Sequence, residues 1–142
     1  MEPSVIPQPC RRKVIRLLTY AAAVILLFDL VASILSQLLP IRYALFSIGS
    51  FAIYFLVGLL VARAAGLKLG VVAAATTGLV EATLGWAISW LVGPGRFPLE
   101  AVRPAEIVAT VIMVILAPVV LGLVGALIGQ LLKRRAPAAG EA

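Results

Sequence analysis

Four long apolar stretches constrain this chain more than any other feature, because each is long enough to cross a lipid bilayer as a helix. They are residues 17–39, 43–62, 69–92 and 107–132. An α-helix rises ~1.5 Å per residue, so ~20 apolar residues span the ~30 Å hydrocarbon core. The chain is 63% hydrophobic and 13% charged, which excludes a disordered chain, a disulfide scaffold and a typical soluble enzyme. The sequence therefore predicts an all-α integral membrane protein, a four-helix bundle.

Basic residues lie between the apolar stretches and at both ends of the chain, and their distribution predicts orientation. Nine of the 12 Lys and Arg fall on one side of the predicted membrane, and only Arg42, Arg96 and Arg103 fall on the other. The positive-inside rule then places both termini in the cytoplasm and the protein in the cell (inner) membrane. We expect a cytoplasmic basic N-terminal tail (1–16), a transmembrane domain (17–132) and a cytoplasmic C-terminal tail (133–142).

The first and third apolar stretches contain a weak repeat. Three alanines (21–23) precede Asp29 and three more (73–75) precede Glu81, with the same offset of 52 residues. One hypothesis is a duplication that gives two parallel repeated helical hairpins, related by an axis along the membrane normal. The alternative is a chance match, because Ala is common in a chain of this composition.

Two acids interrupt the apolar stretches. Asp29 follows Arg16 by 13 residues and Glu81 follows Lys68 by 13 residues. Because both stretches run in the same direction, the two carboxyls lie at the same depth, ~20 Å from each basic flank and close to the midplane. No Lys or Arg lies inside any stretch, so each acid must be protonated, share a proton, or bind a cation or a partner's positive group.

Two interpretations of these acids remain open. Asp29 and Glu81 either form a proton or cation relay, or act as neutral carboxyls that pin helices together through hydrogen bonds to Ser or Thr. Small and polar residues share helix faces at 3–4 spacing, with Thr77, Gly78, Glu81 and Gly85 on one side of the third stretch. That stretch is rich in Thr and Gly, so we expect it to be the most enclosed by protein. The supporting polar residues are Ser33, Ser36, Ser47, Ser50, Tyr54 and Thr77. The helix-packing glycines are Gly58, Gly78, Gly85, Gly125 and Gly129.

Several function classes are disfavoured by what the sequence lacks. It has no His and only one cysteine, Cys10, so it offers neither the usual general base nor a thiol-based zinc site or an internal disulfide. No phosphate loop, zincin or nucleophile-elbow pattern occurs. We therefore expect no enzyme activity, no catalytic residue, no cofactor and no metal. The basic excess is explained by orientation, so we expect no nucleic-acid partner.

The remaining interpretations concern association and transport. The first is a small multi-pass membrane protein that acts through helix–helix association or membrane-complex assembly, as a homo-oligomer or within a larger membrane complex in the lipid bilayer. The alternative is a proton- or cation-coupled transporter or channel subunit that uses Asp29 and Glu81. The sequence does not specify the ion, the substrate or the partner.

Overall fold

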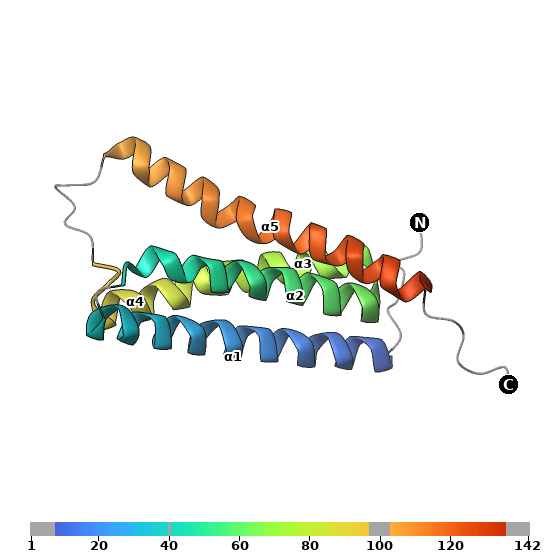
Figure 1. Cartoon of the computed structure of the whole chain (residues 1–142). Coiled ribbons are helices and arrows are strands. Elements are labelled where there is room, and N and C mark those ends of the chain that lie inside the picture. The colour runs from blue at the N-terminus through green and yellow to red at the C-terminus, as the bar shows by residue number, and fades with distance from the viewer. Residues whose placement is uncertain (1–7, 40, 97–102, 136–142) are drawn as a thin grey trace, which may run out of the picture.

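The computed structural model describes residues 8–39, 41–96 and 103–135, and all of its regular structure is helical (Figure 1). Four spans are long and apolar enough to cross a membrane. The first is α1 (Gln8–Leu38); the second is a 3-10 turn, η1 (Tyr43–Phe46), that continues into α2 (Ser47–Ala65). The third consists of α3 (Leu67–Val80), the π-helical segment η2 (Glu81–Gly85) and α4 (Trp86–Val92); the fourth is α5 (Pro104–Arg135). The predicted all-α, four-helix membrane architecture is confirmed.

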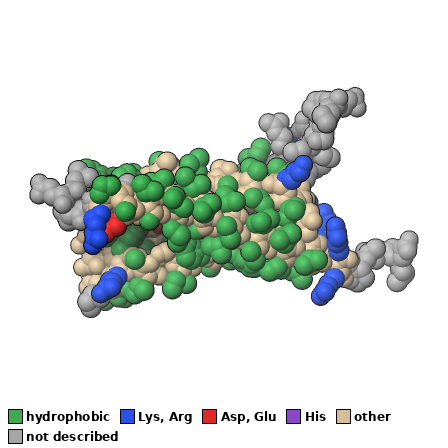
Figure 2. Space-filling view, turned by 90° about the horizontal axis from the view of Figure 1, so that it is seen from above, with side chains coloured by type: hydrophobic (Ala, Val, Ile, Leu, Met, Phe, Trp, Pro, Cys, Tyr) green, Lys and Arg blue, Asp and Glu red, His purple; other side chains and the backbone are tan. Residues whose placement is uncertain are grey.

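The two ends of the bundle differ in which parts of the chain they hold. α1 begins and α5 ends at the same end of the bundle, which we call the terminal end (Figure 1). The opposite end, where α1 ends and α5 begins, we call the loop end. Apolar side chains cover the face between these ends in Figure 2, and Lys and Arg side chains gather at the ends themselves. This distribution is that of an integral membrane protein.

The helices extend beyond the apolar stretches that predicted them. We expected α1 to begin at Leu17, but it begins at Gln8; α5 begins at Pro104 and continues through the last basic residues to Arg135. Backbone hydrogen bonding does not stop where hydrophobicity stops, because a solvated basic helix end is stable, and proline is tolerated in a first turn. Residues 8–16 and 133–135 are thus helical, while residues 1–7 and 136–142 of the expected tails lie outside the described residues.

The second span occupies the centre of the bundle, where glycines let its backbone approach its neighbours. A Cβ at Gly58 would lie 2.8 Å from the Cα of Gly122, and one at Gly70 would lie 2.7 Å from the carbonyl oxygen of Gly58. Gly125 and Gly129 on α5 lie against the backbone of Phe55 and Leu59 on α2. Small residues allow this close packing between membrane helices. Gly122 and Gly70 were not among the predicted packing glycines.

The loop-end half of α5, residues 104–116, stands away from the other helices (Figure 1). Every described side chain from 108 to 116 is exposed. Only 12% of the residues in the most apolar part of this span are buried, against 28% in each of the other three. The expectation that the third span is the most enclosed is therefore wrong, because the buried fraction is the same in the first three spans.

The helix arrangement does not add support to a duplicated hairpin. A two-fold repeat would pair α5 with α1 in the way that α2 pairs with α3. In the described residues α2 packs extensively along α3, whereas α1 packs against α2 and the third span and makes no comparable contact with α5.

Candidate functional site

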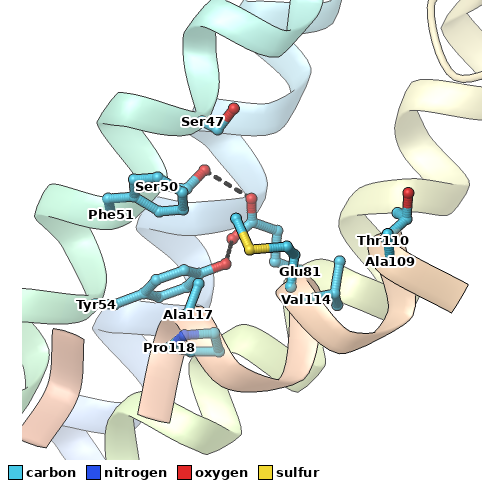
Figure 3. Close-up of a pocket in the computed structure, with 11 residues that line it drawn as sticks. Ser47, Ser50, Phe51, Tyr54, Glu81, Ala109, Thr110, Val114, Ala117 and Pro118 are labelled. Atoms are coloured by element: carbon cyan, nitrogen blue, oxygen red, sulfur yellow. Dashed lines mark hydrogen bonds between the residues drawn. The ribbon is translucent and has the colours of Figure 1, made fainter. Parts of the chain in front are cut away.

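The carboxyl of Glu81, midway along the third span, is bonded to the second span (Figure 3). Ser50 Oγ donates a hydrogen bond to Glu81 Oε1 over 2.6 Å, and the Tyr54 hydroxyl donates one to Oε2. Ser50 and Tyr54 are one helical turn apart on α2, so their hydroxyls point the same way. Both oxygens of the acid are therefore oriented by donors from one neighbouring helix.

Glu81 also begins the π-helical segment, which changes the face that the third span presents. Residues seven apart lie on nearly the same face of a regular α-helix. Gly78 lies against Pro118 of α5, yet Gly85 lies against Asp29 of α1. The prediction that Gly78 and Gly85 share one face is therefore wrong, because the wider π turn rotates the chain between them, whereas Gly85 does lie beside Glu81. Such segments are frequent at functional sites.

A cavity of about 340 Å³, which we call the lateral cavity, opens between α2 and the loop-end half of α5. Glu81, with its partners Ser50 and Tyr54, forms one wall (Figure 3). The α5 wall includes Thr110 and Met113, whose side chains are exposed on the surface of the bundle. Figure 2 shows this face hollowed toward the loop end. The cavity is therefore open sideways, where lipid surrounds a membrane protein.

Asp29 lies beside Glu81 on the other side of Gly85. Its side chain is only 2% exposed. A Cβ at Gly85 would overlap Asp29 Oδ2 and would lie 3.3 Å from Glu81 Cγ, so the two acids flank this glycine. A second cavity of about 80 Å³, the inner cavity, is lined by both acids together with Ser47, Ser50 and Tyr43. The two acids, Asp29 and Glu81, which the sequence predicts at equal depth, therefore lie close to each other around Gly85.

Three residues, Ser47, Ser50 and Glu81, line both the lateral and the inner cavity. The Glu81 carboxyl therefore stands between a space open toward lipid and a space that contains the Asp29 carboxyl. None of the described residues forms a hydrogen bond with Asp29 Oδ2. The arrangement offers one acid with oriented oxygens and a second with a free oxygen, which is suited to holding a proton or a monovalent cation.

The other predicted polar residues form no hydrogen bond with Glu81; Ser47 lines both cavities beside it but donates to the carbonyl of Ala44. Ser36 donates to the carbonyl of Ser33 over 3.0 Å, and the buried Thr77 donates to the carbonyl of Ala73 over 2.9 Å. Both hydroxyls satisfy their own helix rather than an acid. Ser33 is fully buried on α1, one turn beyond Asp29 toward the loop end.

Sequence reasoning missed Thr110, Ser89 and the role of Tyr43 in lining the inner cavity. Ser89 had a detectable signal, because it lies one turn after Gly85 and extends the small and polar face of that helix. Thr110 and Tyr43 had none, because their placement depends on how α5 tilts and how the first loop folds back. Among the described residues, no group of three or more His, Cys, Asp or Glu forms a metal-binding cluster.

Arginine stabilises the loop end next to this site. Arg96 Nε donates to the carbonyl of Trp90 over 2.9 Å, and its Nη2 donates to that of Leu91 over 3.1 Å. Its guanidinium also lies 5.6 Å from the centre of the Trp90 ring. Arg96 therefore caps the end of α4. Arg103 pairs with Glu106 at 3.5 Å in the first turn of α5.

Fold and site together define an integral membrane protein of four spanning helices with two carboxyls around a central glycine. A comparison with protein families, curated proteins and solved structures finds no match for this chain. Any function must therefore be argued from the geometry of the site.

Proposed function

We propose that this protein is a proton- or cation-coupled transporter or channel subunit, without enzyme activity, in which Glu81 binds the transported charge. The observation that carries the proposal is the position of the Glu81 carboxyl between the lateral and the inner cavity, with Asp29 beside it. A carboxyl that served only to pin two helices would need neither cavity nor second acid.

Electrostatics favours a charge-binding role for this pair. A charged acid at the centre of a span costs roughly 2.5–3.5 kcal/mol on insertion scales. The sequence holds no Lys or Arg inside any of the four apolar stretches to offset that cost. A proton or a cation bound at the carboxyl offsets it instead. Two neighbouring carboxylates also repel each other when both are charged. The state in which the pair retains one proton is therefore more stable than the doubly charged state.

The coupling step follows from this competition. When a cation binds at the Glu81 carboxylate, the proton held there moves to the Asp29 carboxylate or to water. When the cation leaves, a proton returns to Glu81. Proton and cation thus occupy the same carboxylate in turn, and this alternation exchanges one for the other.

The test is proton and monovalent-cation flux in proteoliposomes that contain the wild type or the double variant Asp29→Asn, Glu81→Gln. The matched control is Glu106→Gln, which removes an acid outside the membrane centre. We expect flux in the wild type and in the control, and loss of flux in a double variant that still elutes as folded protein. Absence of flux from the wild type, or equal flux in the double variant, would contradict the proposal.

A second candidate function, helix–helix association within a homo-oligomer or a larger membrane complex, is favoured by α5. Its loop-end half contacts little of the bundle, and Val111 and Ile115 are 52% and 60% exposed. Replacing Ile115 with Trp would disrupt an interface packed there. Multi-angle light scattering in detergent would then report a lower mass than for the wild type, and an unchanged mass would count against association through α5.

We also propose that both termini face the cytoplasm of a cell whose inner membrane holds the protein, which the distribution of Lys and Arg supports. A reporter fused after Ala142 tests this orientation. Activity of a reporter that works only outside the cytoplasm would reverse it.

A further inference from the structure

A polar seam between α1 and the third span leads from Asp29 to the loop end. Asp29 lies against Gly85, and two turns further on Gln37 lies against Gly93. The residue numbers in each of these two contacts differ by 56. Ser33 and Ser89 differ by the same number, and they lie between the two contacts, one turn from each. We propose that this seam is a water-filled path along which protons move between the loop end and the Asp29 carboxyl. We define the α1–α4 seam by Asp29, Ser33, Gln37, Gly85, Ser89 and Gly93.

Buried polar atoms without partners carry this inference. Asp29 Oδ2, Ser33 Oγ and Ser89 Oγ are buried and form no hydrogen bond with any described residue. The three side chains are 2%, 0% and 1% exposed. Buried polar groups in native proteins are almost always paired, either with protein or with ordered water. Three such groups along one seam therefore indicate a row of water molecules.

The remaining hydroxyls of the described helices show that this pattern is specific to the seam. Thr19, Thr76, Thr83 and Thr110 each donate to the carbonyl four residues earlier, and Ser36, Ser47 and Thr77 also bond to their own helix backbone. Ser50 bonds to Glu81. A serine in a helix can bond to the carbonyl of the preceding turn. Among the described serines and threonines, only Ser33 and Ser89 form no hydrogen bond, and both belong to the α1–α4 seam.

At the loop end the seam reaches the surface of the bundle at Gln37. Gln37 is exposed, and the eight residues from Asp29 to Gln37 cover ~12 Å of helix. At that end the backbone of Gly95 closes over Ser89, and its N–H donates to the Ser89 carbonyl over 3.1 Å. A Cβ at Gly95 would lie 2.7 Å from Ser89 Oγ, so only a glycine leaves room at this hydroxyl.

The titratable groups that face Asp29 are consistent with proton movement. Glu81 faces it from η2, Tyr43 from η1 and Tyr54 from α2, whereas α4 contributes no titratable side chain. The Tyr43 hydroxyl also lies beside the hydroxyls of Ser33 and Ser89, close enough for a weak interaction, but it meets hydrogen-bond geometry with neither. A proton entering at Gln37 passes along water to Asp29 and then to Glu81. This last step rests on the proposed function; the water-filled seam does not.

Thiol accessibility tests the seam without any transport assay. In a Cys10→Ser background, single variants Ser33→Cys and Ser89→Cys place a thiol in the α1–α4 seam. Ile34→Cys and Ala87→Cys place one on neighbouring lipid-facing positions at similar depth. The probe is Ag⁺, a small aqueous ion that reacts with ionised thiols in water. Unreacted thiol is counted by maleimide labelling after denaturation, in protein reconstituted in nanodiscs.

We expect Ser33→Cys and Ser89→Cys to react at least tenfold faster than their lipid-facing neighbours. A smaller ratio at either seam position overturns the inference, because the water path would then not reach Asp29. The result is separable from the proposed function. Flux with an unreactive seam refutes the path alone, and a reactive seam in a protein without flux refutes the transport role alone.

Discussion

Removing the Tyr54 hydroxyl tests whether the cross-helix bond to Glu81 stabilises the bundle. Tyr54→Phe deletes this donor and leaves the ring in place, so Glu81 keeps only Ser50. A bond to a charged group in a water-soluble protein contributes ~1.5–3 kcal/mol. Interhelical bonds in membranes average ~0.6 kcal/mol with a maximum near ~1.7, because the unfolded helices find other partners in the membrane. We therefore expect a loss of ~0.6–1.7 kcal/mol, or about 3-fold to about 16-fold in the folding equilibrium.

The assay is reversible unfolding by dodecyl sulfate in mixed micelles, followed by tryptophan fluorescence. Tyr20→Phe is the matched control, because Tyr20 is 63% exposed on α1 and its loss should change the free energy of unfolding little. A double-mutant cycle with Glu81→Met isolates the bond, since Met has similar length and forms no strong hydrogen bond. If Tyr54→Phe costs as much in the Glu81→Met background as in the wild type, the bond contributes nothing and the reasoning fails.

Three further substitutions probe other contacts by the same unfolding assay. Gly85→Ala would place a methyl group against the Asp29 carboxylate, so we expect ~1–3 kcal/mol of destabilisation from overpacking; wild-type stability would mean that the two acids are not packed around this residue. Gly122→Leu should force α5 away from α3 at Ala74 and cost at least as much, and a neutral result would contradict the close packing of these two helices. Arg96→Ala frees two carbonyls at the end of α4 and should cost ~0.5–1.5 kcal/mol. Arg96→Lys should recover only part of that loss because Lys lacks the planar fork, and full recovery would show that charge alone matters.

The spans were predictable from the sequence because membrane insertion depends on a local property, the length of an apolar stretch. The pairing of Ser50 and Tyr54 with Glu81 was only half predictable. All three residues were marked as polar positions, and the depth of Glu81 followed from its distance to Lys68. Which helix would face Glu81 depends on rotation about the helix axis, and periodicity on one helix does not report how two helices turn toward each other.

The π-helical segment could not be predicted from the sequence. A regular 3.6-residue period assigns Gly78 and Gly85 to one face, yet they contact α5 and α1 respectively. No local sequence pattern predicts the wider turn between Glu81 and Gly85. The lateral cavity was equally hidden, because it results from the slant of α5 and not from any residue that lines it.

The slant of α5 links the site to the thickness of the membrane. Its apolar stretch of 26 residues measures ~39 Å along the helix, more than the ~30 Å of hydrocarbon it crosses. A helix longer than the bilayer accommodates the excess by tilting, and a thicker bilayer reduces that tilt. The terminal-end half of α5 is held by Gly122, Gly125 and Gly129 against α2, so a change of tilt falls on the half that borders Glu81. The length of the lipid chains therefore determines the width of the opening of the lateral cavity.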